Sequence, residues 1–524
     1  MKETDRISIL NKLTEGQLKH KQAALQLGIS VRQVKRLVKQ SKREGISVVM
    51  DKNPGKFVNR FILLTLLVYF TIHLANLTLL PIFNDESIYL GWGKNITTPI
   101  NHIYHLFVSL TDAKQPLMIW IFGIFEYFFT DPLFAGRFAS VIVGSITALG
   151  IYMVTKKLCN NHAALVATLL YSIIPIFVFY NRQALLEAGV ACIGIWSCNA
   201  LLNVLKKPTA LNGVILGAIF GIGFFIKSSS LLFIVSSTLI IFFYLFIKRR
   251  WELVKPFVVS LAAFFLVDFI LFINPTFWQT FHTNSRYSYT PAELLSFPLI
   301  SWFMNFLGFF QIGFIFVTPL VFVFSIIGMF FLWKNKVKNN QLFLAYFLFA
   351  LLLEIFASRG QIQRYLVSFL PFLVIPASYV LSNFWNGNIL KKSVVIVSFF
   401  IPLVLTLVLI INPQYYISQL AKVSRYSDVG YIQGQTSGYG INEAMQYIQE
   451  HSTPSHPSLI LTANNIGNPE TAVFVYAQKN PQLVVLTITA NSFPWIDEYK
   501  CMNSEGIIPI VPVFFVTREN QLSG

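Results

Sequence analysis

Residues 229–247 read SSLLFIVSSTLIIFFYLFI and are followed directly by Lys248, Arg249 and Arg250. The stretch contains no Asp, Glu, Lys, Arg or His, and its length is close to the roughly 20 apolar residues that an α-helix needs to cross a bilayer. An excess of Lys and Arg marks the cytoplasmic ends of such helices. The stretch therefore predicts a membrane-spanning helix that ends in the cytoplasm.

The composition of the whole chain extends this interpretation. Of its 524 residues, 55% are hydrophobic and only 12% are charged, and 51 are Phe. A soluble domain carries about 25% charged residues, so this chain has too little charge to cover a water-facing surface. The composition excludes a soluble enzyme, a disordered protein and a collagenous protein, and most of the chain is expected to face lipid.

Apolar stretches of this kind recur between residues 57 and 412, separated by short polar breaks. When every basic cluster is placed in the cytoplasm, eleven spans are predicted, near residues 58–80, 133–155, 162–180, 184–205, 210–227, 229–247, 255–273, 309–333, 341–357, 363–381 and 393–412. The N-terminus then lies in the cytoplasm and the C-terminus outside. The apolar run 116–130 is shorter than a span and is predicted to be interfacial or re-entrant.

The composition divides the chain into three predicted domains. Residues 1–56 are polar and basic, residues 57–412 are the membrane domain, and residues 413–524 return to a mixed, soluble character. The last region predicts a small extracytoplasmic α/β domain with helices at 442–450 and 469–479 and strands at 459–462, 483–488 and 511–516. It has no Gly-rich phosphate loop, so we expect it to shape an acceptor site rather than perform chemistry.

Ionisable side chains near the predicted outer ends of the spans are the candidates for function. They include Asp85, Glu86, Lys114, Arg182, Glu187, Lys227 and Arg364. Such groups are costly at membrane depth and usually line a functional cavity, although each would also serve as a simple helix cap at the headgroups. Because they gather on one side of the membrane, we favour a site.

These residues also form a series of short motifs in chain order. The series is Asp85-Glu86-x-x-Tyr89, Lys114-x-Pro116-Leu117, Arg137, Arg182-x-x-x-x-Glu187, Gly221 to Lys227, and Arg364-Tyr365 with Pro371. It resembles the GT-C membrane glycosyltransferases, in the branch of protein O-mannosyltransferases and lipid A aminoarabinose transferases. The aminoarabinose branch usually has Arg where Ile88 stands, so that substrate does not carry over.

The resemblance implies an inverting hexosyl- or pentosyltransferase that uses a polyprenyl-phosphate sugar on the outer face of the membrane. Its acceptor would be a protein, a lipid or a polysaccharide. Asp85 would be the general base, with a pKa raised by partial dehydration, and Glu86 would orient the base or the acceptor. The remaining expected roles are donor phosphate binding by Lys114, Arg182, Lys227 and Arg364, because negative charge develops on the leaving group, and substrate binding by Tyr89, Glu187 and Tyr365.

No cofactor and no metal are expected, because the four cysteines are scattered and no His, Cys and carboxylate cluster has metal-ligand spacing.

The N-terminal region carries a second resemblance. Residues 20–37 read HKQAALQLGISVRQVKRL and resemble a helix-turn-helix of the transposase and repressor type, with Ser30 as N-cap of the second helix. That helix would present possible DNA-binding side chains, Arg32, Gln33, Lys35 and Arg36. The alternative is a basic helical hairpin that contacts anionic lipid.

The predicted fold class is thus mainly α: a polytopic GT-C-like helical bundle with a small cytoplasmic helix-turn-helix and a small outer α/β domain. We expect an integral membrane protein of a bacterial or archaeal inner membrane. Two other functions compete with glycosyl transfer. A membrane-anchored DNA-binding regulator would need only one span, and a transporter usually shows internal repeats with broken helices at mid-membrane.

Overall fold

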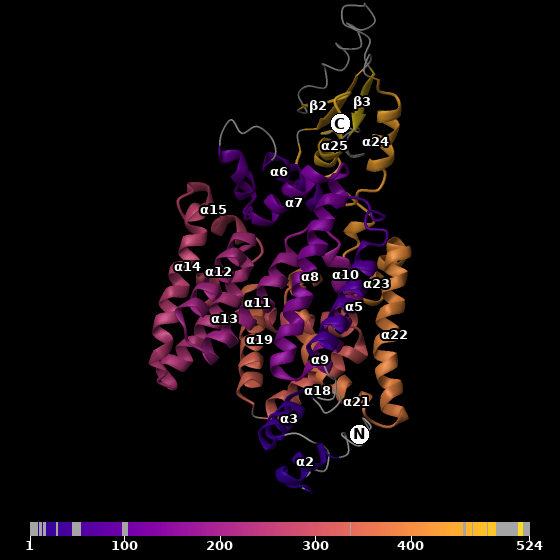
Figure 1. The fold of residues 1–524 in the computed structure, drawn as a ribbon. Helices are drawn as coiled ribbons and strands as arrows, with labels where there is room; N and C mark the ends of the chain where they lie inside the picture. The colour runs from indigo at the N-terminus through magenta and orange to yellow at the C-terminus, as the bar shows by residue number, and fades with distance from the viewer. Residues whose placement is uncertain are drawn as a thin grey trace, which may run out of the picture.

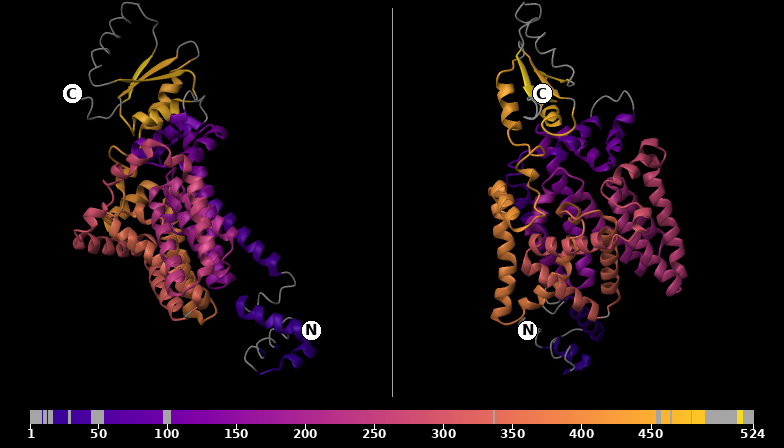
Figure 2. Two further views of the ribbon diagram at one scale, coloured as in Figure 1. Left: turned by 90° about the vertical axis from the view of Figure 1, so that its left-hand side faces the viewer. Right: turned by 180° about the vertical axis from the view of Figure 1, so that it is seen from behind.

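A computed structural model gives the fold of the chain (Figure 1). It describes Ile9, Leu13 and residues 17–27, 30–44, 54–96, 103–335, 337–453, 457–463, 465–478, 480–488 and 512–516. Long helices form a bundle with the N-terminal helices at one end and a small sheet at the other (Figure 1, Figure 2). The predicted fold class is confirmed in this respect.

The helices of the bundle follow the apolar stretches of the sequence. They are α5 (Pro54–Leu74), α7 (Leu117–Phe128), α8 (Pro132–Leu158), α9 (Asn161–Ile173), α10 (Pro175–Asn181), α11 (Glu187–Lys206), α12 (Ala210–Ile226), α13 (Leu231–Phe242), α14 (Val254–Phe272), α17 (Leu299–Phe316), α18 (Pro319–Lys334), α19 (Lys338–Ala357), α21 (Pro371–Trp385) and α22 (Ile389–Ile411). Among the described residues, seven helices are long and apolar enough to cross a membrane, or eight if the bent pair α9 and α10 is one span. The chain is therefore an integral membrane protein.

Short helices connect these elements. They are α6 (Asn84–Gly93), η1 (Lys94–Ile96), η2 (Ile103–Asp112), η3 (Ser228–Ser230), η4 (Phe243–Ile247), η5 (Trp251–Leu253), α15 (Pro275–Asn284), α16 (Pro291–Leu294), α20 (Gln363–Leu366), α23 (Pro413–Val423) and η6 (Val429–Tyr431). Helices α6, α7 and α15 lie near the end of the bundle that faces the sheet (Figure 1).

Proline breaks three of the predicted spans. The prediction of one span at 309–333 is wrong, because α17 ends at Phe316 and α18 begins at Pro319, after Thr318 with a φ of 73°. Pro lacks an N–H and disfavours helical backbone in the residue before it. The span predicted at 162–180 bends by 66° between α9 and α10, and the one at 363–381 is divided into α20 and α21. The run at 116–130 forms α7, which is shorter than a span.

Glycines on α12 bring it unusually close to α14. Gly213, Gly217 and Gly221 recur every four residues and so share one face of the helix. A Cβ atom on Gly213 or Gly217 would overlap the carbonyl oxygens of Pro256 or Ser260 on α14. Small residues at this spacing let two helix backbones pack closely in a membrane.

The C-terminal region forms the predicted α/β unit. Strand β1 (Ser458–Ala463) lies between β2 (Leu483–Ile488) and β3 (Val513–Val516), and both neighbours run parallel to it. Helices α24 (Ile441–Glu450) and α25 (Glu470–Ala477) accompany the sheet. Residues 479 and 511, at the ends of a predicted helix and a predicted strand, lie outside the described residues.

Two helices, α2 (His20–Leu27) and α3 (Val31–Glu44), make up the described part of the N-terminal region. They pack through a small apolar core of Leu13, Ala23, Ala24 and Val34. Ser30 caps α3 as expected: its hydroxyl accepts from the Gln33 amide at 3.2 Å, and the Gln33 side chain accepts from the Ser30 amide at 2.9 Å. Gly28, which would form the turn, lies outside the described residues, so the helix-turn-helix stays a prediction.

We predict that Gly217→Val destabilises the protein, because the new side chain would displace α12 from the Ser260 carbonyl. Overpacking typically costs about 1–3 kcal/mol. The midpoint of thermal unfolding in detergent should therefore fall by several degrees. Gly360→Ala is the matched control, since no atom lies near a Cβ at that position. Equal midpoints for the two variants would contradict the close-packing interpretation.

Candidate active site

A cavity of about 480 Å³ lies beside α6, which contributes Asp85 and Tyr89 to its lining, and its size is within the range of small-molecule sites. Seven of the nine residues predicted for catalysis or substrate binding line it: Asp85, Tyr89, Lys114, Glu187, Lys227, Arg364 and Tyr365. They come from segments far apart in the chain. The other two, Glu86 and Arg182, do not line it.

Three ion pairs form the centre of the cavity. Arg364 Nη1 donates to Asp85 Oδ2 at 2.6 Å, and its Nε donates to Glu187 Oε1 at 2.9 Å. Lys227 Nζ donates to the same Glu187 oxygen at 2.8 Å. Each partner lies near the end of a helix: Glu187 opens α11, Lys227 follows α12, and Arg364 lies in α20. Acidic groups at helix N-termini and basic groups at C-termini are favoured by the helix dipole.

Asp85 is ionised in this arrangement. Burial opposes its charge, but the positive charge of Arg364 and the hydrogen bond from it outweigh burial, with Lys114 adding to them, and lower the pKa of Asp85 below its ordinary value. The expectation of a raised pKa is therefore wrong, because it considered dehydration without the arginine. At neutral pH Asp85 is therefore a carboxylate.

The rim of the cavity contains two lysines and two tyrosines. Lys114 lies 5.7 Å from the Tyr287 ring centre and Lys227 lies 6.0 Å from that of Tyr365. The two rings meet edge to face at 6.5 Å. Lys114 has only a weak ion pair, at 3.7 Å to Asp112. Its positive charge is thus largely available to a ligand.

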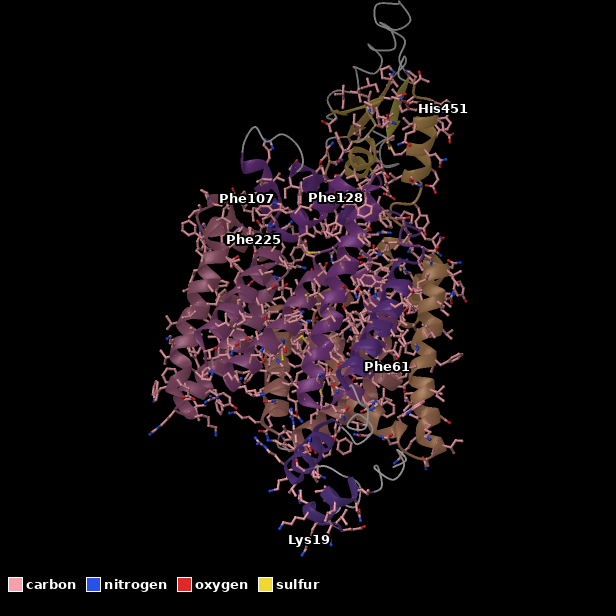
Figure 3. All side chains as sticks on the ribbon, in the orientation of Figure 1. Lys19, Phe61, Phe107, Phe128, Phe225 and His451 are labelled. Carbon is pink, nitrogen blue, oxygen red and sulfur yellow. The ribbon has the colours of Figure 1, made fainter. Side chains whose placement is uncertain are left out.

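An aromatic cluster supports the segment that carries Lys114. Trp120 packs edge to face between Phe107 and Phe225, with ring centres 5.4 Å and 5.2 Å apart. Its indole N–H donates to the Leu106 carbonyl at 2.8 Å. Phe107 and Phe225 lie in the upper part of the helical region in Figure 3. The cluster fixes the loop between η2 and α7.

Glu86 does not line the cavity but is buried in an ion pair beside it. Its side chain and that of Arg137 are fully buried, and they pair through two hydrogen bonds of 2.6 Å and 2.9 Å. The carboxylate also accepts from the backbone amides of Phe83 at 2.9 Å and Ala184 at 2.7 Å. Because these donors occupy both oxygens and Glu86 does not line the cavity, direct contact of Glu86 with an acceptor has no support here, and its role in orienting the base stays a prediction.

Two arginines hold the loop that leads to Asp85. Arg137 donates to the carbonyls of Leu77, Leu80 and Pro81 at 2.7–3.1 Å. Arg182 donates to the carbonyls of Ala75 and Asn76 at 2.6 Å and 2.8 Å. The guanidinium of Arg182 points to the backbone of this loop and does not line the cavity, so donor phosphate binding by Arg182 stays a prediction that this geometry does not support.

The C-terminal domain also contacts this loop. The Asn468 backbone amide donates to Asn84 Oδ1 at 2.8 Å, and the Asn468 side chain donates to the Ile82 carbonyl at 3.0 Å. Tyr431 stacks on Phe83 with ring centres 4.0 Å apart. The domain thus contacts Ile82, Phe83 and Asn84, the three residues directly before Asp85.

Several cavity residues were not predicted: Ser228, Ser229, Asn284, Tyr287, Ser288 and Glu354. Those between 228 and 288 belong to no motif, and only the fold brings them to the cavity. Glu354 did have a signal, since it is the one acidic residue in the apolar stretch 341–357. Within the described part of the chain, no group of three His, Cys, Asp or Glu side chains is arranged to hold a metal.

Comparisons with known proteins bear on the fold and on one segment of the chain. The chain has the fold of the GT-C class of membrane glycosyltransferases. Within that class, residues 113–278 match the family described as dolichyl-phosphate-mannose-protein mannosyltransferase. This segment contains Lys114, Arg137, Glu187 and Lys227. The search of curated proteins found no match.

Solved structures resemble more than four fifths of the chain in fold. The archaeal oligosaccharyltransferase AglB from Archaeoglobus fulgidus, in complex with an inhibitory peptide and a dolichol-phosphate, has a TM-score of 0.51 and 13% identity over 83% of this chain and 65% of its own. The structure of its complex with Zn and sulfate has a TM-score of 0.50 and 13% identity, over 82% of this chain and 62% of the enzyme's own. The chain thus spans less than two thirds of that enzyme. ArnT from Cupriavidus metallidurans bound to undecaprenyl phosphate has a TM-score of 0.47 and 15% identity, over 86% of this chain and 95% of its own.

We predict that Glu86→Gln strongly lowers stability, because it leaves Arg137 as an uncompensated buried charge. Breaking such a pair costs about 3–5 kcal/mol, and the midpoint of thermal unfolding should fall accordingly. Glu293→Gln is the control: it breaks the Glu293–Arg359 pair, which is equally short at 2.6 Å but exposed, and should have far less effect. A similar loss in both variants would argue against the special role of burial.

Proposed function

We propose that the protein is an inverting glycosyltransferase that moves a sugar from a polyprenyl-phosphate donor to a hydroxyl acceptor on the outer face of the membrane. The observation that carries the proposal is the cavity itself, where an ionised Asp85 lies beside Lys114, Lys227 and Arg364. The proposal includes hexosyl and pentosyl donors, and acceptors on protein, lipid or polysaccharide.

The donor phosphate would bind to Lys114, Lys227 and Arg364. Lys114 is weakly paired and open to a ligand, and cations at the leaving group stabilise the charge that develops there. Apolar side chains of Val190, Leu231, Leu232, Ile362 and Phe369 line the same cavity and suit the first isoprene units. The likeness in fold to an enzyme solved with a dolichol-phosphate supports this assignment.

Asp85 would act as the general base. It accepts the proton of the acceptor hydroxyl while the hydroxyl oxygen attacks the anomeric carbon of the donor. The bond from that carbon to the phosphate oxygen breaks, and its electron pair leaves with the phosphate. Attack opposite the leaving group inverts the anomeric configuration, and no covalent enzyme intermediate forms.

The basic residues support an outer location for this reaction. Helix α11 begins at Glu187 in the cavity and ends at Lys206, next to Lys207. A helix of that length spans about 30 Å, so the cavity and the basic cluster lie on opposite sides of the bilayer. Placing the basic side in the cytoplasm puts the cavity and the C-terminal domain outside, in a bacterial or archaeal cell membrane.

We predict that Asp85→Asn reduces glycosyl transfer by about 10²- to 10⁴-fold, the usual contribution of a general base. Membranes that contain each variant would be supplied with a labelled polyprenyl-phosphate sugar, and labelled product would be counted. Glu443→Gln, in an exposed turn of α24, should retain transfer. Full transfer by Asp85→Asn would refute the base assignment, and sugar uptake without transfer would favour a transporter.

A second function is supported by the exposed face of α3. Arg32, Lys35, Arg36 and Lys39 are exposed and recur at spacings that place them along one side of the helix. The opposite side is used for packing through Val34. Such a row of cations fits the phosphates of duplex DNA. The Gln33 side chain, in contrast, folds back onto Ser30, which leaves it less suited to read bases.

We predict that the full chain in nanodiscs of zwitterionic lipid binds duplex DNA, and that Arg32→Glu with Arg36→Glu weakens binding at least ~10-fold at low salt. Lys19→Glu with Lys21→Glu changes the charge equally on the exposed part of the α2 region and should weaken binding less. Filter binding over a salt series measures both. No DNA binding, or binding only to anionic vesicles, would contradict this second function.

A further inference from the structure

Glu354 is a buried carboxylate in the wall of the catalytic cavity. It lies in the last turn of α19, only 8% of its surface is exposed, and it lines the cavity together with Ala357 and Ser358. Two hydrogen bonds from the Asn305 side chain, at 3.0 Å and 2.7 Å, hold the carbonyls of Ile355 and Ser358 around it. The backbone that presents Glu354 is therefore fixed.

The three acidic residues of the cavity differ in their partners. Asp85 is paired with Arg364, and Glu187 with both Arg364 and Lys227. Glu354 forms no ion pair with any described residue. A buried carboxylate without a partner cation is strongly disfavoured, and ionisable groups within a membrane domain usually serve a function. The Gln361 side chain and the charge of Lys227 act on Glu354. Because it forms no ion pair, its carboxylate can still accept hydrogen bonds from a ligand.

The chemistry around Glu354 selects the kind of ligand. A phosphate would be repelled by the carboxylate and attracted to Lys114 and Lys227 instead. Asp85, Glu187 and Arg364 are paired with one another, and the cavity also contains neutral polar groups, among them Asn284, Ser288 and Ser368. Such groups hydrogen-bond well to hydroxyl groups. The ring of Tyr365 offers a flat apolar surface in the same cavity. Neutral polar groups, one carboxylate and an aromatic ring together suit a sugar ring.

We propose that Glu354 recognises the sugar of the donor by accepting hydrogen bonds from its ring hydroxyl groups. This inference rests on the proposed function and assigns a specificity-determining residue within it. It divides the cavity into a cationic part for the phosphate and a part near Glu354 for the sugar. A site built to hydrogen-bond a hydroxyl rejects analogues that lack it, because its own polar group is then left unpaired.

The test separates the sugar from its carrier. Purified protein in nanodiscs would be titrated with bare polyprenyl phosphate, with polyprenyl-phosphate mannose and glucose, and with their monodeoxy analogues. For wild type, we expect at least one sugar to improve binding over the bare lipid phosphate and at least one deoxy analogue to lose the gain. Glu354→Ala should lose about 10- to 100-fold in affinity for the sugar-linked lipid, as expected for one or two hydrogen bonds to a charged acceptor. Its affinity for bare polyprenyl phosphate should stay equal or rise, because a negative charge is removed.

Two further variants keep the result interpretable. Glu354→Gln preserves the shape and most of the packing and should show an intermediate loss. Asp268→Asn changes another buried acidic residue, on α14 and outside the cavity, and should leave the sugar-to-carrier affinity ratio unchanged. The inference is overturned if Glu354→Ala changes both ligands by the same factor or changes neither. If wild type binds neither ligand, the proposed function itself fails.

Discussion

The buried ion pair between Glu86 and Arg137 is the interaction on which the site depends. It joins the start of α6 to α8, and the same arginine binds three carbonyls of the loop before Asp85. Because neither side chain reaches solvent, each charge needs the other to remain buried. The pair and these carbonyl contacts hold the loop before Asp85 against α8, next to the residue that lines the cavity.

Charge in this apolar protein is arranged in two layers around that support. The inner layer is structural: Glu86, Arg137 and Arg182 use their charges on one another and on backbone carbonyls. The outer layer lines the cavity, where Arg364 pairs with two carboxylates and Glu187 pairs with both Arg364 and Lys227. Shared ion pairs can be exchanged when an anionic ligand enters, whereas the saturated inner pair cannot. The adjacent residues Asp85 and Glu86 thus have different surroundings: Asp85 lines the cavity, whereas Glu86 is buried outside it.

Much of the fold and part of the site follow from the pattern of apolar and charged residues. A bilayer makes ionisable side chains scarce, so Asp85, Lys227 and Arg364 stand out as site candidates. The pattern does not tell which way each side chain points, and it therefore did not show that Glu86 and Arg182 lie outside the cavity lining. Tyr287 was missed because it lies in a connection without a motif. The span predicted at 309–333 failed because hydropathy alone does not register the break before Pro319.

The sequence by itself determined that the chain is a membrane protein, where its polar residues gather, and the motif series of a GT-C enzyme. These properties depend on composition and order along the chain. Only the tertiary structure decided which charges are paired with each other and which remain for a ligand. In the structure Arg364 pairs with Asp85 and Arg137 pairs with Glu86, whereas Glu354 has no ion pair among the described residues. This pairing depends on distances between segments as many as 279 residues apart, which local sequence does not encode.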